Sequence, residues 1–399
     1  MKRDKEEDVK AKAEFLPVDE RRVPELLESY GATLSEQDQL LFQLLQQYDA
    51  SQNCNLERFQ PLHWGPGAAG VYADIFRLGP QLWKRPSENQ FYLSLNYERM
   101  RQTALQLPLD LQLSGSLASV NAELYDPRFL LPLFACVLGG EWRTQLRPFV
   151  AQGCLSLCLA VSALADGPLR SLAFLVLNRF CERLRGLEAD AELWFPEKAQ
   201  LLYFLVLLRN SLPQAGHQFA PLQAHFLGQI GELLLQPQEP AYPLLLKHLL
   251  SKATLELAEL PAFAALLQSG DAELAGRQRL WLLRCLAEGI RSAADWPLLQ
   301  RRGQLAALLA FAQSPFASLS ELSLILQVLD KCIEVGFERR LMKEGLLAWL
   351  LCLPSEHRKS AHQQLQALIA KLTGAGELGQ SRKAQLALLQ DTIGLASAI

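Results

Sequence analysis

The chain has 399 residues, of which half are hydrophobic (50%) and 20% are charged. This balance supports a large buried core and excludes a mainly disordered chain. Lysines and arginines number 39 against 42 acidic residues, which gives a net charge of -3. The charge excludes a chain-wide polycation that coats nucleic acid, so any nucleic-acid contact must come from a local patch.

The cysteines and the apolar runs predict a chain without a disulfide framework or membrane spans. Most of the eight cysteines lie inside apolar runs, which is typical of buried free thiols in a reducing compartment. The N-terminus is charged and lacks the apolar stretch of a secretory signal. A membrane span needs about eighteen or more apolar residues in a row. The run over residues 201–208 is shorter and stops at Arg209.

The first part of the chain shows no steady helical pattern. Residues 1–25 are dense in mixed charge and predict a flexible leader, and residues 26–125 predict an irregular helical N-terminal part. A helix over residues 97–107 is expected to stop before Pro108. Ser35 and Asp38 fit a capping box. The helix that follows is expected to place five apolar side chains on one face: Leu40, Leu41, Leu44, Leu45 and Tyr48.

From Asp126 onward, apolar helices follow one another, and residues 126–399 predict an α-solenoid of helical repeats. Asp126 is expected to cap a helix that starts at Pro127. One pair of helices is predicted over residues 145–164 and 169–184. Residues 319–335 carry two apolar stripes, which predict burial on two sides.

The fold class follows from these patterns. Alternating β-branched runs do not occur, and no repeat of fixed length is visible. The sequence therefore predicts an all-α fold, an irregular HEAT- or armadillo-like α-solenoid, with roughly 60–70% helix.

The patterns that could carry chemistry have simpler structural explanations. Residues 65–70 match the dinucleotide-binding pattern G-x-G-x-x-G, but no strand precedes them, so a turn into a short helix is expected. Cys154 and Cys158 are one helical turn apart, and no further Cys or His lies close enough in sequence to complete a zinc site. No Walker A loop and no nucleophile elbow occur. The sequence predicts a protein that is not an enzyme and has no catalytic residue, cofactor, metal or small-molecule substrate.

One local patch is rich in arginine. Residues 277–302 contain six arginines and only two acidic residues. A guanidinium group can donate two parallel hydrogen bonds to a phosphate or a carboxylate, so the patch is a candidate contact for RNA or an acidic partner. The alternative is internal pairing, such as Arg284 with Glu288. The candidate contact residues are three arginines spaced seven apart, which would share a helix face, and two that would fold back beside them: Arg277, Arg284, Arg291, Arg301 and Arg302.

An ordered set of short segments resembles one known family. The segments are Tyr30-Gly31-Ala32-Thr33-Leu34-Ser35 with Asp38, Pro61-Leu62-His63-Trp64-Gly65-Pro66, Leu82-Trp83 with Pro86-Ser87, Tyr125-Asp126-Pro127-Arg128-Phe129-Leu130-Leu131-Pro132, Trp281-Leu282-Leu283, Gly289-Ile290-Arg291 with Asp295, Arg301-Arg302, Ser314-Pro315 and Trp349-Leu350. In this order they are similar to the C-terminal region of the nucleolar pre-ribosomal-associated protein family, also called the unhealthy-ribosome-biogenesis family.

The resemblance implies a non-enzymatic scaffold in early assembly of the large ribosomal subunit and in rRNA processing. It implies binding to pre-ribosomal RNA and to assembly factors that include a DEAD-box helicase, and a location in the nucleolus, inside the nucleus. Family members are several times longer, so the resemblance also implies that this chain corresponds to a C-terminal portion. The alternative is a generic protein-binding α-solenoid adaptor without an RNA role.

Overall fold

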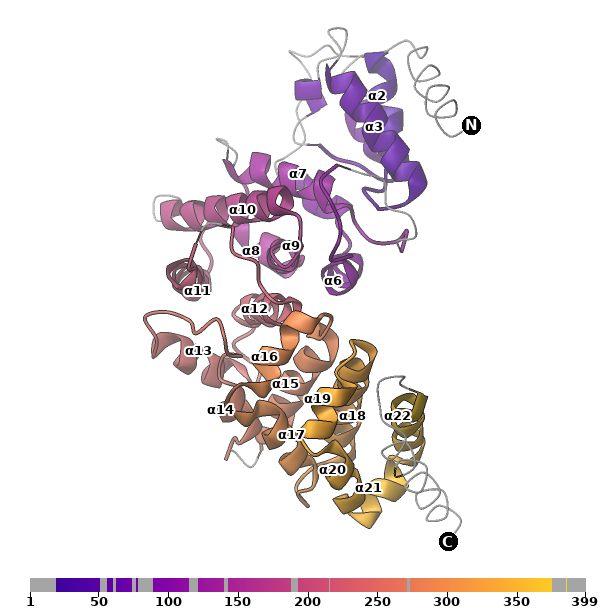
Figure 1. The fold of residues 1–399 in the computed structure, drawn as a ribbon. Coiled ribbons are helices and arrows are strands. Elements are labelled where there is room, and N and C mark those ends of the chain that lie inside the picture. The colour runs from indigo at the N-terminus through magenta and orange to yellow at the C-terminus, as the bar shows by residue number, and fades with distance from the viewer. Residues whose placement is uncertain are drawn as a thin grey trace.

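The computed structural model describes residues 19–50, 56–59, 62–73, 77, 89–114, 121–139, 143–187, 193–214, 216–270, 273–374 and 385. Helices make up 70% of the protein, and the predicted all-α fold is confirmed. The β pairing in these ranges is one isolated bridge between Thr33 and Tyr125. Helices stack into an elongated body, with α2 and α3 at one end and α20 to α22 at the other (Figure 1). Among the described helices, none has the length and apolar character that a membrane span needs.

The N-terminal part consists of short helices and connecting loops packed around aromatic rings. The ring of Phe129 lies edge-on to Tyr30 at 5.0 Å and to Trp64 at 5.2 Å, measured between centroids. The predicted leader lies outside the described residues as far as residue 18, and Val23 and Pro24 are already buried. The helices of this part are η1 (Glu20–Arg22), α2 (Val23–Ser29), α3 (Glu36–Ala50), η2 (Leu56–Phe59), α4 (Ala68–Tyr72), η3 (Gln90–Ser94) and α6 (Tyr97–Gln106).

Two details of the predicted helix after Ser35 differ from expectation. The Ser35 hydroxyl accepts from the amide of Asp38 at 3.2 Å, as a cap should. The Asp38 carboxylate, however, accepts from the amides of Gly31 and Thr33 and so fixes the preceding loop. Leu40 was expected on the apolar face, and this is wrong, because it is 63% exposed. It follows Asp38 by two residues and therefore lies on the opposite side of α3 from the buried face.

The helix that begins at Pro127 confirms the predicted cap. An Asp126 carboxylate oxygen accepts from the amide of Arg128 at 2.9 Å, and the Arg128 guanidinium lies 2.7 Å from the other oxygen. Asp126 and Arg128 are both buried, so their charges compensate each other inside the protein. Three apolar side chains of the first turns of this helix are buried in the core: Phe129, Leu130 and Leu133.

The middle of the chain contains α7 to α13. The single helix predicted over residues 145–164 is instead two helices, because Gly153 adopts φ +76°, a left-handed conformation that only glycine takes readily. The predicted second helix of this pair is confirmed, with Asp166 accepting from the amide of Leu169 at 2.8 Å. The helices are α7 (Pro127–Gly139), α8 (Leu146–Ala151), α9 (Cys154–Val161), α10 (Gly167–Gly186), α11 (Lys198–Ser211), α12 (Pro221–Leu233) and α13 (Tyr242–Leu250).

The C-terminal part repeats one arrangement of helices. Several pairs of residues that contact one another across neighbouring units are 40 to 44 residues apart, as in the hydrogen bonds from Arg279 to Glu321 and from Trp349 to the Leu309 carbonyl. The helices are α14 (Phe263–Leu267), α15 (Ala275–Gly289), η5 (Ala293–Asp295), α16 (Trp296–Gln300), η6 (Arg301–Gly303), α17 (Gln304–Ala312), α18 (Leu319–Glu334), α19 (Glu338–Lys343), α20 (Leu346–Cys352), α21 (Ser355–Ser360) and α22 (His362–Gly374).

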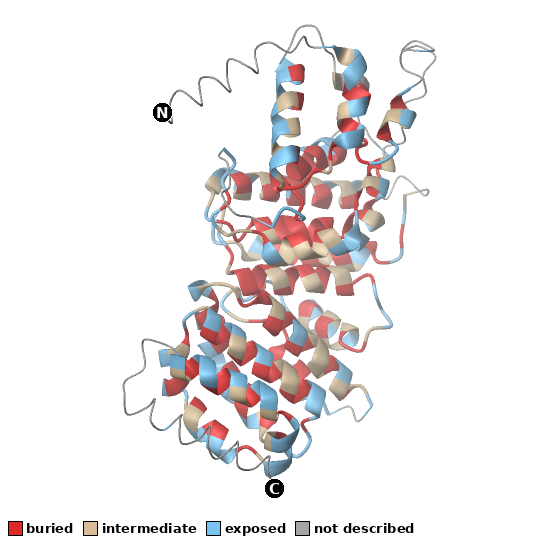
Figure 2. Ribbon diagram, turned by 90° about the vertical axis from the view of Figure 1, so that its right-hand side faces the viewer, coloured by how far each residue is buried: buried red, intermediate tan, exposed pale blue. Residues whose placement is uncertain are grey.

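Five helices pack in sequence order as one layer: α9, α12, α15, α18 and α22. The last three run parallel, because Arg279 meets Glu321 near their N-terminal ends and Gln364 meets Ser323 in the same way. The two-sided burial predicted for residues 319–335 is confirmed, since α18 lies between α15 and α22 and buries Leu322, Ile325 and Leu329. Buried and exposed positions alternate along these helices as stacked repeats require (Figure 2).

The cysteines follow the prediction in part. Five of the seven in the described ranges are buried, while Cys136 and Cys352 are exposed. Burial raises the pKa of the Cys154 and Cys158 thiols well above the usual range, so both remain protonated core side chains. In the ranges that the structure describes, no three His, Cys, Asp or Glu residues gather as metal ligands.

Candidate interaction surface

Helix α15 carries the exposed part of the arginine patch. It buries Leu282, Leu283 and Leu286 on its inner side, which turns Arg277 and Arg284 outward into solvent. Seven residues of helix separate these two arginines, which places their Cα atoms about 10 Å apart on one face. Both guanidinium groups can meet an anion, since no acidic side chain among the described residues forms an ion pair with either of them.

Arg291 does not share that face, contrary to the prediction. Helix α15 ends at Gly289, and the Arg291 side chain turns inward to donate to the carbonyl oxygen of Leu107. Its burial lowers the pKa of the guanidinium, although the nearby Asp295 opposes this shift. The turn is fixed by Asp295, whose carboxylate accepts from the amides of Arg291 and Leu222, each at 2.8 Å. Arg291 is therefore a structural residue that holds the loop after α6.

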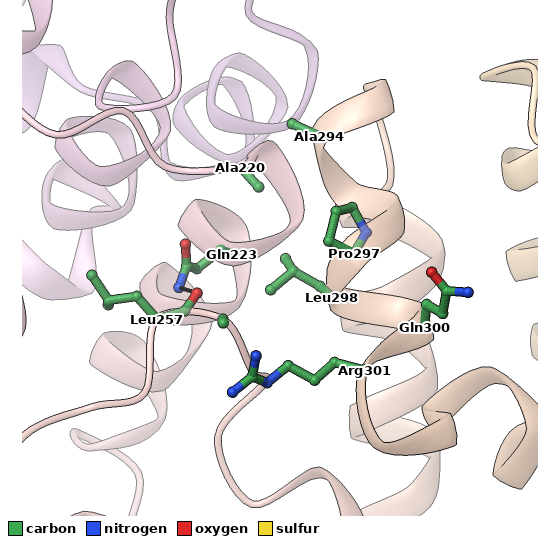
Figure 3. A pocket seen from close by; sticks show the side chains of 9 residues that line it. Ala220, Gln223, Leu257, Ala294, Pro297, Leu298, Gln300 and Arg301 are labelled. Carbon is green, nitrogen blue, oxygen red and sulfur yellow. Dashed lines mark hydrogen bonds between the residues drawn. The ribbon is translucent and has the colours of Figure 1, made fainter.

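Arg301 and Arg302 are exposed but paired. Glu259 lies 3.1 Å from the Arg301 Nε and 2.7 Å from the Arg302 Nε. Arg302 adopts φ +51° and Gly303 φ +65°, so the chain reverses here before α17. Arg301 also lies at the edge of a pocket of about 400 Å³ between α12 and α16, where the Gln223 amide donates to the Leu257 carbonyl (Figure 3). The structure does not bring these two arginines onto the exposed face of α15.

The internal pairing expected as the alternative also differs from the prediction. Glu288 does not pair with Arg284. It lies 2.6 Å from the guanidinium of Arg101 on α6 and 3.7 Å from the imidazole of His225 on α12. Arg279, a further arginine of the patch, is held by the buried Glu321 at 2.6 Å and lies over the Phe311 ring. The patch is thus reduced to two free cations, Arg277 and Arg284.

A buried polar cluster where α6, α9, α12 and α15 meet was missed by sequence reasoning. Glu232 accepts from the hydroxyls of Ser156 and Tyr97, and burial raises the pKa of its carboxyl. Burial lowers the pKa of His225 to about 4, and repulsion from the guanidinium groups of Arg101 and Arg291 adds to this shift. The side chains of this polar cluster come from four separate helices, so no local spacing in the sequence could have indicated the cluster.

The glycine-rich stretch confirms the expected turn. Gly65 and Gly67 have φ of +83° and +89°, and the short helix α4 follows directly. The Gly67 amide, where a phosphate would sit in a dinucleotide fold, donates instead to the Glu28 carboxylate at 3.2 Å. The stretch is a structural connection between α2 and α4.

The architecture defines the protein as an armadillo-like α-solenoid with a small cationic face on one of its long helices. A family model described as Nucleolar pre-ribosomal-associated protein 1 matches residues 155–349, from α9 to α20. Nucleolar pre-ribosomal-associated protein 1 of Mus musculus and that of Homo sapiens are each 30% identical to the chain over 82% of its length. These matches confirm the family resemblance, and the chain is related to the nucleolar pre-ribosomal-associated protein 1 family. No solved structure matches it.

The chain spans 15% of the length of each of these two relatives. Their names agree with the predicted nucleolar location. The matched range includes both arginines of the exposed face, Arg277 and Arg284.

Proposed function

We propose that this chain is a non-catalytic scaffold in assembly of the large ribosomal subunit, and that α15 contacts pre-ribosomal RNA through Arg277 and Arg284. The family relationship supports the ribosomal setting. The observation that carries the RNA contact is that, of the six arginines of the patch, Arg277 and Arg284 are the two that point to solvent with no acidic partner among the described residues. Arginines in this state can exchange their counterions for phosphates without breaking an internal pair.

The remaining arginines of the predicted site have smaller roles in this proposal. Arg301 and Arg302 share their charge with Glu259 and Glu256, so an approaching phosphate would compete with carboxylates already in place. Arg291 stabilises the fold in this proposal and does not contact RNA. Assembly factors, including a DEAD-box helicase, are further partners in this proposal, as the family resemblance implies.

The proposal predicts a specific effect of charge reversal. The double variant Arg277→Glu, Arg284→Glu is expected to lose association with pre-ribosomal particles while its circular dichroism and melting stay close to wild type. For single-stranded RNA the slope of log affinity against log salt falls by about 0.7 for each lost phosphate contact, so the slope should fall by about 1.4. Co-sedimentation and salt-dependent RNA binding measure the two effects.

A matched control separates this contact from general charge. The variant Arg209→Glu, Lys343→Glu makes the same charge change at two exposed cations on α11 and α19, away from α15. It should bind as wild type. Equal losses in both variants would contradict a site on α15. If the Arg277→Glu, Arg284→Glu variant associates normally with protein partners in the absence of RNA, the result would favour the rival function, a protein-binding adaptor without an RNA role.

A further inference from the structure

The gap between α18 and α22 differs from the equivalent gap one repeat earlier. Between α15 and α18, Arg279 and Glu321 fill the space with a close ion pair, and Phe311 packs beneath the guanidinium. Between α18 and α22, the corresponding contact is a hydrogen bond of 2.7 Å from Gln364 to Ser323. Serine is far shorter than arginine, so this gap is left open as a cavity of about 510 Å³.

The cavity has the polar character of a binding site. Among the described residues no carboxylate lines it, and its one charged side chain is Lys359, which is exposed. The polar groups around it are two hydroxyls, two amides and an imidazole, which can donate and accept, and two apolar side chains form part of its wall. The lining residues used here are Leu319, Ser323, Lys359, Ser360, His362 and Gln364.

The cavity also lies in line with the exposed arginines of α15. Because α15, α18 and α22 run parallel, the exposed residues Arg277, Ser320 and Gln363, each in the first turn of its helix, make a row across the three N-terminal ends. Adjacent packed helices are about 8–10 Å apart, so the row crosses from Arg277 to the cavity within two helix spacings. A flexible anionic strand can follow this row.

We infer that the cavity between α18 and α22 holds one unstacked nucleotide of single-stranded RNA, an inference that rests on the proposed RNA contact of α15. A volume of about 510 Å³ is within the range of small-ligand pockets. Lys359 supplies one positive charge for one phosphodiester, and the Gln364 amide and Ser323 hydroxyl can hydrogen-bond a base edge. The His362 imidazole and the Leu319 side chain offer surfaces against which a base can lie.

The test uses the full chain and a fluorescent single-stranded RNA oligonucleotide, together with copies in which one nucleotide at a time lacks its base. Fluorescence anisotropy should show that a missing base at one position weakens binding to wild type about tenfold. Filling the cavity with Ser323→Leu should weaken binding of the intact RNA by a similar factor and abolish the dependence on that base. Removing the charge with Lys359→Ala should lower the salt slope by about 0.7.

Two controls keep the inference falsifiable. Lys343→Ala, which removes an exposed lysine from α19, should bind as wild type, and Lys359→Ala decides the question if Ser323→Leu fails to fold. If the missing base and both variants change nothing while the Arg277 and Arg284 variant loses RNA, the inference is wrong and the proposed function stands. If wild type binds no RNA, both fail. Binding of poly-glutamate in place of RNA, lost in Ser323→Leu, would also overturn the inference.

Discussion

The two ends of the molecule are held together in different ways. In the C-terminal part, contacts recur between residues 40 to 44 apart, so the units from α18 onward meet their neighbours in a regular way. In the N-terminal part and where it meets the start of α7, contacts are particular to one place, such as the buried pair of Asp126 with Arg128 and the rings around Phe129. Regular stacking distributes stability over many similar interfaces, whereas the irregular part depends on a few buried interactions.

The largest expected effect contrasts two helix caps, one from each part. Asp126→Ala removes a cap together with the carboxylate that lies 2.7 Å from the buried Arg128 guanidinium, which should cost about 3–5 kcal/mol. Ser318→Ala removes a cap of α18 at a more exposed site and should cost about 1 kcal/mol. Urea unfolding of both variants measures the contrast. Equal losses would show that the irregular part does not depend on this pair.

A smaller effect concerns the packing of the C-terminal part against α12, in the middle of the chain, at the end of α15. A side-chain carbon added at Gly289 would lie 2.8 Å from Leu222 Cδ1 and 3.0 Å from the His225 ring. Gly289→Ala should therefore destabilise the fold by about 1–3 kcal/mol. Gly276→Ala, in the same helix, meets open space and should cause no loss, because alanine favours helix more than glycine does. Thermal melting of the two variants tests this, and a stable Gly289→Ala protein would contradict such close packing.

The smallest effect is a pH dependence that arises at the same junction. His225 has a pKa of about 4 in the folded protein and about 6.5 when unfolded, so the unfolded chain binds more protons between these values. Stability should be complete above pH 6.5 and should fall as the pH is lowered toward 4, by about 1 kcal/mol between pH 7.5 and 5.5. Urea unfolding at these two pH values measures the loss.

Substitutions assign this dependence to one residue. His225→Gln should remove the loss of stability between pH 7.5 and 5.5. Glu232→Gln should retain it, because the raised pKa of Glu232 acts in the opposite direction and favours the fold as the pH falls. A loss that persists in His225→Gln would assign it to another group.

Local signals in the sequence predicted local structure well. The Asp126-Pro127 pair predicted the start of α7, and the stripes of residues 319–335 predicted the two-sided burial of α18, because caps and periodicity act within one helix. The repeat of the C-terminal part could not be detected in the sequence, because its units share the spacing of their contacts and not the residue types that make them. Arg279 with Glu321 and Ser323 with Gln364 have nothing chemical in common, although they lie at equivalent places.

The candidate site could be predicted only in part for the same reason. The sequence indicated an exposed helix face with Arg277 and Arg284, but it could not show that the chain turns at Gly289 and sends Arg291 inward. It also could not show that Glu259 lies beside Arg301 and Arg302, since that neighbour comes from the preceding unit. Pairing across units depends on the register of the stack, which no short segment contains.

The contacts of α6 with the C-terminal end of α15 have a mechanical consequence. The Arg101–Glu288 pair and the bond from Arg291 to Leu107 join residues more than 180 residues apart in the chain. They close a long loop that contains α7 to α14. A pulling force applied at the C-terminal side can peel away α22 and then α18 one interface at a time, but it meets this closure at α15. Beyond that point the enclosed helices carry the load together, so the protein extends in small steps at one end and resists as a block at the other.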